Sequence, residues 1–167
     1  MGVAVDIGSF RAAMARFPGA VTIVTACTAE GERRGITATA VCSVSAEPPS
    51  LLVCLNRKTG TCAAVRETGR FNVSLLTEGA AAVAVALQFA GMGGATGAAK
   101  FDTGDWQADA RGLPVLAGAV VQFSCDVAEV TDAGSHTVFI GHIVNLASAE
   151  APALVYEQAR FHRLLPL

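Results

Sequence analysis

The residues Asn56 to Thr61, with the sequence NRKTGT, combine several groups that bind phosphate in proteins. Arg57 and Lys58 carry positive charge, and Thr59 and Thr61 carry hydroxyl groups. A helix is predicted to start here with Thr61 as its cap, and free N–H groups at a helix N-terminus favour an anion. The segment matches neither the Walker loop nor GxGxxG. It therefore predicts a phosphate site on another scaffold, with a solvated turn and an ordinary threonine cap as the alternative.

Two of the three histidines lie in the segment GSHTVFIGHI, from Gly134 to Ile143. His136 follows a turn and begins a predicted strand, so its side chain can reach the mouth of a barrel built from such strands. His142 lies six residues further on, with the same strand parity. For each histidine, the alternative to a role in the site is a purely structural role in its strand.

The segment GITATAVCSVSAEPP, from Gly35 to Pro49, is β-prone but almost devoid of large side chains. It follows a basic pair, Arg33-Arg34. Small side chains would let a planar ligand approach the backbone N–H and C=O groups between Thr37 and Cys42. The alternative is that the strand faces a neighbouring helix or a second subunit at close range.

Hydrophobic periodicity and turn residues predict the elements that must position these groups. We expect a hairpin of two strands, and a central, fully apolar third strand from Ser50 to Leu55 after two interrupting prolines. We also expect a mobile, glycine-rich loop at Gly91–Lys100 and a turn at Gly112–Leu116. The hairpin strands are Ala20–Thr28 and Arg34–Ser45; further strands are Phe71–Leu76, Ala119–Thr131, Thr137–Ser148, Ala153–Tyr156 and Arg160–Leu164; the helices are Ser9–Phe17, Thr61–Thr68 and Gly79–Phe89. Many short strands with few helices favour a closed β-barrel with peripheral helices.

The composition narrows the functional classes. A chain of 167 residues suits one domain, residues 1–167, and its 52% hydrophobic residues include only 6% aromatic ones. The formal net charge is −2, without a basic stripe, which argues against nucleic acid or an anionic membrane surface as a partner. No apolar run approaches the length of a membrane span, and no secretory signal is visible. Five cysteines without a CxxC pair predict reduced thiols, a cytoplasmic location and no metal site.

Seven segments, in order along the chain, together resemble the flavin-reductase-like family. They span about Phe10 to Leu164, and the thin strand ending in SVSAEPP is the most specific. The segments are FPGAVTIVT, GITATAVCSVSAEPPSLLVCLNRKTGT, GRFNVSLL, KFDTGDW, GLPVLAGAVVQFSC, GSHTVFIGHI and ALVYEQARFHRL. The resemblance implies a mainly β fold with peripheral helices, the FMN-binding split β-barrel, in the small NAD(P)H:flavin oxidoreductase components of two-component monooxygenases.

The resemblance also implies roles for individual residues. The flavin ring and ribityl chain would lie along the thin strand, the phosphate at the NRKTGT loop, and the nicotinamide beside His136. The implied flavin-binding residues are Thr37, Ala38, Thr39, Ala40, Val41, Cys42, Ser43, Asn56, Arg57, Lys58, Thr59, Thr61, Gln88, Phe89, Lys100 and Phe101; those on the NAD(P)H side are His136, Arg160 and Phe161. Glu157-Gln158 and the glycine-rich loop depart from the family pattern where the adenine half of NAD(P)H or FAD would be held.

The implied activity is NAD(P)H-dependent reduction of FMN or FAD, with reduced flavin passed to a partner monooxygenase by a homodimer. Hydride would move between the two bound molecules, so the chain needs no nucleophile and no general acid. One alternative is a non-reductase flavoprotein on the same barrel, similar to pyridoxamine-phosphate oxidases. Another is a non-catalytic module that binds flavin or haem.

Overall fold

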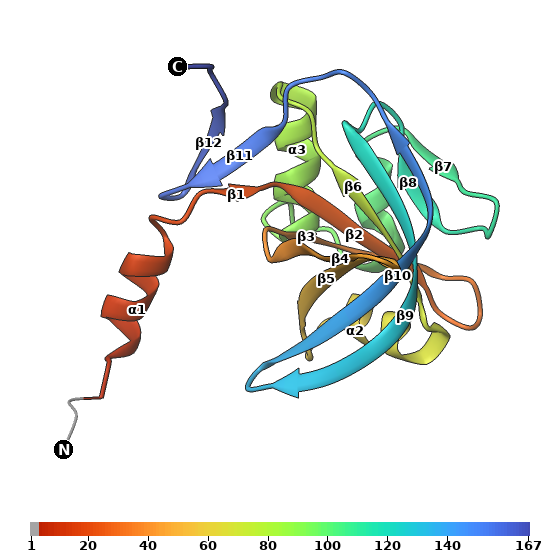
Figure 1. Cartoon of the computed structure of the whole chain (residues 1–167). Coiled ribbons are helices and arrows are strands. Elements are labelled where there is room, and N and C mark those ends of the chain that lie inside the picture. The colour runs from red at the N-terminus through yellow and green to blue at the C-terminus, as the bar shows by residue number, and fades with distance from the viewer. Residues whose placement is uncertain (1–3) are drawn as a thin grey trace.

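The computed structural model describes residues 4–167, which form a mainly β fold with helices at its periphery (Figure 1). The helices are α1 (Ile7–Met14), α2 (Gly60–Thr68), α3 (Ala80–Phe89) and the 3-10 helix η1 (Gly97–Asp102). The strands are β1 (Gly19–Ala20), β2 (Thr22–Cys27), β3 (Arg33–Ala38), β4 (Val41–Ala46), β5 (Pro49–Asn56), β6 (Arg70–Leu75), β7 (Trp106–Ala108), β8 (Pro114–Leu116), β9 (Val121–Ala133), β10 (His136–Ser148), β11 (Leu154–Glu157) and β12 (Arg160–Arg163).

The main sheet has seven antiparallel strands in the order β3-β2-β6-β9-β10-β5-β4. Its two edge strands, β3 and β4, are consecutive in the sequence and are joined only by Thr39 and Ala40. The sheet must therefore curl until its edges nearly meet, yet β3 and β4 do not pair with each other. The expected closed barrel is thus split along this line, as the family resemblance implied.

The single strand predicted over Arg34–Ser45 is two strands with different partners. Its first part, β3, pairs with β2 as the predicted hairpin requires, with Ala38 opposite Thr22. Its second part, β4, pairs with β5 on the far side of the sheet, with Val41 opposite Val53. Strand propensity is continuous across Thr39-Ala40, so only the curvature of the whole sheet shows where the partner changes.

Two clusters of buried side chains fill the fold. One lies between the curved sheet and α2, and the other lies between β2, α3 and η1. The first includes Val53, Leu55, Val65, Phe71 and Phe139; the second includes Ile23, Val85, Phe89, Phe101 and Leu116. Strand β5 lies next to β4 rather than at the centre of the sheet, which corrects that prediction. Its Leu51, Val53 and Leu55 are buried, whereas Leu52 and Cys54 are half-buried on the outer face.

Helix α1 stands apart from the rest of the chain in Figure 1, and none of its residues is buried. Its cap is Asp6, whose Oδ1 accepts from the Ser9 N–H at 3.0 Å, so Ser9 is not the cap as predicted. Ile7, Phe10 and Met14 of this helix are all exposed. Among residues 4–167, no helix has the length and apolar character needed to span a bilayer.

A short hairpin of β7 and β8 stands where only a turn was predicted, and a polar cluster fixes it to the sheet. The Asp109 carboxylate accepts from the Asn72 side chain at 3.0 Å and from the Ser124 hydroxyl at 3.1 Å. Arg111 donates to the Asn72 side-chain oxygen at 3.0 Å and to Asp126 at 2.7 Å. We call these five residues the Arg111 cluster.

Candidate functional site

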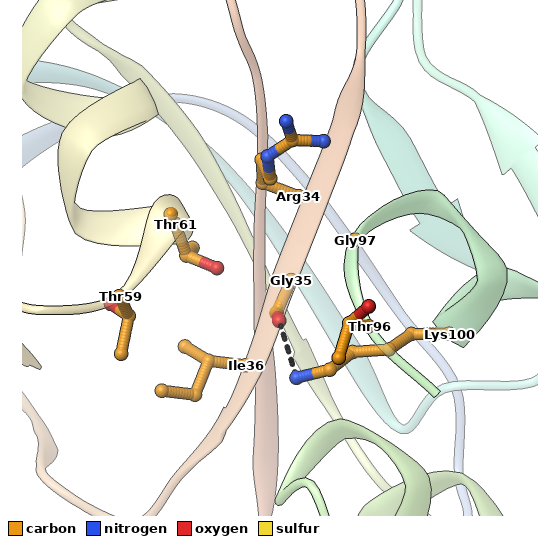
Figure 2. A pocket seen from close by; sticks show the side chains of 9 residues that line it. Arg34, Gly35, Ile36, Thr59, Thr61, Thr96, Gly97 and Lys100 are labelled. Carbon is orange, nitrogen blue, oxygen red and sulfur yellow. Dashed lines mark hydrogen bonds between the residues drawn. The ribbon is translucent and has the colours of Figure 1, made fainter. Parts of the chain in front are cut away.

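A pocket of about 400 Å³ lies between β3, the start of α2 and η1 (Figure 2). Figure 2 shows Thr59 and Thr61 on one side of β3, and Thr96 and Lys100 on the other. We call this cavity the Arg34 pocket; its lining residues are Arg34, Gly35, Ile36, Thr59, Gly60, Thr61, Thr96, Gly97 and Lys100. Two cationic side chains, threonine hydroxyls and a helix N-terminus therefore converge on one space.

The start of α2 presents hydrogen-bond donors to this pocket. Thr59, not Thr61, is the cap: its hydroxyl oxygen accepts from the Cys62 N–H at 3.2 Å and donates to the Asn56 carbonyl at 2.8 Å. The first intrahelical bond reaches back from the Ala63 N–H to the Thr59 carbonyl at 3.2 Å. The N–H groups of the two residues between the cap and Cys62 thus have no partner inside the helix, as at any helix N-terminus.

Lys100 forms the opposite wall. Its Nζ donates to the Phe89 carbonyl at 3.0 Å and approaches the Gly35 carbonyl at 3.5 Å, joining the end of α3 to β3. Burial lowers the pKa of Lys100 from its usual 10.5, because the charged ammonium group is partly removed from water. The ammonium group therefore fixes the pocket wall while one N–H remains free for a ligand.

The predicted phosphate loop divides between two places. Thr59 and Thr61 line the Arg34 pocket, whereas Arg57 and the exposed Lys58 do not. The Arg57 N–H donates to the Ser135 carbonyl at 3.0 Å, and its guanidinium lies 3.9 Å from the Asp132 carboxylate. The second cation of the pocket is instead Arg34, which sequence reasoning missed although the basic pair before the thin strand marked its position.

The turn that carries His136 lies beside this loop. In the register of β5 and β10, His136 is directly opposite Asn56. The Nδ1 atom of the exposed His136 is 2.9 Å from the Ser135 hydroxyl, while that of His142 is 3.0 Å from the Ser50 hydroxyl. The fold therefore brings His136, but not His142, next to the predicted phosphate loop.

Half of the thin strand packs against a helix, as the alternative interpretation expected. A methyl group built on Gly35 would collide with the Phe89 ring, and the Thr37 hydroxyl donates to the Ala86 carbonyl of α3 at 2.6 Å. Ala38 and Val41 are half-buried against the core. Beyond them, the open part of the segment consists of Thr39, Ala40, Cys42 and Ser43, all exposed. This open part is where the backbone is accessible to a planar ligand.

A second pocket, of about 220 Å³, lies on the other side of β3, under the hairpin of β11 and β12. Phe161 lines it and packs against Tyr156 with ring centroids 5.1 Å apart. Its other lining residues are Val21, Thr37, Thr39, Ala86, Leu87, Ala90 and Met92. Phe161 and the predicted flavin-binding strand therefore share one cavity, which Arg160 and the half-buried Gln88 do not line.

Two predicted site residues have their rings in the core. Phe89 is fully buried and Phe101 is 5% exposed. Both pack with Trp106, with ring centroids 5.0 Å and 4.9 Å from the Trp106 ring. Their rings shape the walls behind the pockets, and any contact with a ligand would have to come from their backbone atoms.

Comparison with known proteins identifies the same family as the sequence segments, the flavin reductases. Residues 14–165 match the flavin reductase like domain. The chain is 39% identical over 161 residues to the FMN reductase (NADH) RutF of Ancylobacter novellus, covering 95% of this chain and 86% of that protein. It is 40% identical over 156 residues to the reductase component of the FADH(2)-dependent resorcinol hydroxylase of a Rhizobium species, covering 92% and 84%.

Solved structures show the same fold. The styrene monooxygenase flavin reductase of Pseudomonas putida has a TM-score of 0.82 and 31% identity, covering 95% of this chain and 99% of that one. The NADH:FAD oxidoreductase SgcE6 of Streptomyces globisporus, solved with NAD and FAD fragments, has a TM-score of 0.85 and 29% identity, covering 99% and 98%. The chain therefore belongs to the flavin-reductase-like family with its split-barrel fold. It is an oxidoreductase of the flavin reductase type.

Proposed function

We propose that this enzyme uses NADH or NADPH to reduce FMN or FAD, and that a flavin-dependent monooxygenase receives the reduced flavin. The observation that supports this most directly is the Arg34 pocket, a cavity with two cationic side chains and a helix N-terminus beside a strand of small residues. The relatives named above include an NADH-dependent FMN reductase and a reductase component of an FADH(2)-dependent hydroxylase.

The residues of the pocket fit the two ends of a flavin. The exposed residues Thr39, Ala40, Cys42 and Ser43 leave room for a planar, polar-edged ring, and the donors around Thr61 suit a phosphate dianion. Flavin, when bound, accepts a hydride from reduced nicotinamide. The protein's task is to hold the two rings together and to place N–H groups where negative charge gathers, which requires no titrating side chain.

We assign His136 to the nicotinamide side, because it is exposed and directly opposite Asn56 at the edge of the predicted phosphate loop. A residue that positions only the hydride donor should leave flavin affinity unchanged. His136→Ala should raise the KM for NAD(P)H or slow the reduction of bound flavin in stopped-flow measurements. His142→Ala is the matched control, and a slower reduction in the control with none in His136→Ala would transfer the role to His142.

The exposed apolar surface supports a homodimer. Helix α1 contributes Ile7, Phe10 and Met14 without burying any of them, and Val144 and Leu146 of β10 are also exposed. Apolar patches of this kind mark contacts between proteins. Sedimentation or light scattering of the full chain should give twice the mass of one chain.

The five cysteines are free thiols, which supports a cytoplasmic location, and fractionation of the native host would test it.

The deciding experiment is a steady-state assay of NADH and NADPH oxidation, each with riboflavin, FMN and FAD added. A reductase oxidises the nucleotide only when flavin is present, and the fastest combination identifies its pair of substrates. A protein that binds flavin but oxidises neither nucleotide would contradict the proposed function. Adding the flavin-dependent oxygenase whose gene lies nearest to the gene for this protein then tests whether reduced flavin is transferred.

A further inference from the structure

Arg34 lies across the entrance of the pocket, between the first residues of α2 and of η1. A methyl group built on Gly60 would lie 3.2 Å from Cδ and from Nε of Arg34, and one built on Gly97 would lie 3.8 Å from its Nη1. The contact at Gly60 is tighter than a Cβ atom normally allows, whereas the distance at Gly97 is an ordinary van der Waals contact. The β2–β3 hairpin thus brings a guanidinium directly to the N-terminus of a helix.

Thr61 supplies a second, independent sign of a ligand. The residue is 3% exposed and lines the pocket, and its Oγ1 makes no hydrogen bond to any of residues 4–167. Figure 2 shows this hydroxyl directed toward β3, across the cavity. No buried side-chain oxygen or nitrogen of residues 4–167 lacks a partner, so this unpaired hydroxyl is accessible within the pocket and can donate to a ligand oxygen there.

The Arg34 guanidinium has weak partners within the chain. Its Nη2 pairs with the Glu32 carboxylate, and its Nη1 donates to the Arg33 carbonyl at 3.1 Å. The Glu32 side chain is 61% exposed, whereas that of Arg34 is 26% exposed. An ion pair with so exposed a carboxylate contributes little to stability. A doubly charged phosphate group of a ligand can therefore displace Glu32 from the guanidinium.

The neighbouring cations have fewer N–H groups available to a phosphate. Lys100 is bonded to two backbone carbonyls, and the Arg33 guanidinium lies over the Phe101 ring at 4.7 Å, outside the pocket lining. Arg34 is the pocket cation whose planar group can form two parallel hydrogen bonds with a phosphate.

We propose that Arg34 determines the preference for phosphorylated flavin, and that Glu32 competes with the flavin phosphate for the guanidinium. This inference rests on the proposed function, because it takes the occupant of the pocket to be the phosphate of FMN. Riboflavin, which has the same ring without the phosphate, is the natural reference ligand.

The test measures the dissociation constants of FMN and riboflavin by flavin fluorescence on the full chain. Arg34→Gln should raise the dissociation constant of FMN roughly 10- to 100-fold, as expected for lost charge-assisted hydrogen bonds. The dissociation constant of riboflavin should change less than about twofold. Arg33→Gln removes a neighbouring charge of the same sign outside the pocket, and should leave the ratio of the two constants as in the parent. Glu32→Gln should tighten FMN about two- to fivefold.

Several outcomes would overturn the proposal. Equal weakening of both flavins by Arg34→Gln would show a loss of structure, and an equal effect of Arg33→Gln would show a general effect of charge. An increase in the KM for NADPH alone would assign Arg34 to the nucleotide. If Arg34→Gln does not fold, Glu32→Gln decides, because an unchanged FMN constant then refutes the competition. Reduction of riboflavin by the parent tests the proposed function separately, since riboflavin does not use Arg34.

Discussion

The Arg111 cluster and the Arg34 pocket both combine an arginine with acidic and hydroxyl side chains, but they differ in how completely their polar groups are paired. In the Arg111 cluster, the Asp109 carboxylate is 9% exposed and accepts from the Leu113 and Arg111 N–H groups at 2.9 Å and 2.8 Å, besides its side-chain partners. In the Arg34 pocket, the hydroxyl of Thr61 makes no hydrogen bond to any of residues 4–167, and the Arg34 guanidinium is held by an exposed carboxylate.

This difference in pairing indicates that the Arg111 cluster stabilises the fold and that the Arg34 pocket binds a ligand. A fully paired polar cluster rigidifies the part of the fold around it and has little capacity left for a ligand. A pocket with accessible, unused donors keeps them available for a ligand that supplies acceptors. On this comparison, changes in the Arg111 cluster should alter stability without changing flavin preference, and changes in the Arg34 pocket should do the reverse.

The largest expected effect is that of Asp109→Ala. The substitution leaves the Arg111 guanidinium with one fewer carboxylate and removes the acceptor of four hydrogen bonds, from Asn72, Ser124, Leu113 and the Arg111 N–H. Hydrogen bonds to a charged group contribute about 1.5–3 kcal/mol each, so we expect the combined loss to exceed that of any single-contact change. Urea denaturation should show this loss, while the ratio of the FMN and riboflavin dissociation constants should stay at the parent value. A changed ratio would mean that the two regions are coupled and that the comparison fails.

Gly35→Ala should have the next largest effect. The new methyl group would collide with the Phe89 ring and lie 3.3 Å from the Phe101 ring, within a packed aromatic cluster. Overpacking of this kind costs about 1–3 kcal/mol. Gly60→Ala is the matched control, because its methyl group meets only the flexible Arg34 side chain. We expect it to keep the thermal midpoint of the parent but weaken FMN; the opposite pattern in the two variants would contradict the structure.

The acid dependence of stability offers a smaller effect with a definite sign. Burial would raise the pKa of Asp109, but hydrogen bonds from Leu113, Asn72, Arg111 and Ser124 outweigh it and hold the pKa below the usual 3.8. The charged carboxylate therefore stabilises the fold above pH 3.8, and this contribution is lost as the pH falls through the folded-state pKa.

Asp109→Asn tests this sign. The free-energy difference between parent and variant should be largest near neutral pH and should narrow below about pH 4, because the parent carboxylate is then protonated as well. Urea titrations from pH 7 to pH 3 measure it. A difference that widens toward low pH would show that Asp109 is neutral in the folded protein.

Residue types and order along the chain were enough to predict the fold family and most of the strands, whereas the phosphate loop stays a prediction. The place of Thr59 and Thr61 at the start of a helix could be predicted, because a cap and a helix start are local features of the sequence. Arg34 could not be placed, because only the register of β2 with β3 and the curl of the sheet bring it to Gly60. Arg57 was assigned to the phosphate for its charge, but its nearest partners, Ser135 and Asp132, are distant in the sequence.

The smallest expected effect on stability is that of Glu32→Gln, and it is the sharpest contrast with Asp109. Both carboxylates pair with an arginine, but the Glu32 side chain is 61% exposed and the Asp109 side chain 9% exposed. Water and salt screen the exposed pair, so its loss should change the free energy of unfolding by less than about 1 kcal/mol. Differential scanning calorimetry should therefore find the parent midpoint within a few degrees for a domain of this size. A large loss of stability would mean that Glu32 holds the β2–β3 hairpin in place, and that it does not serve as a displaceable competitor for the flavin phosphate.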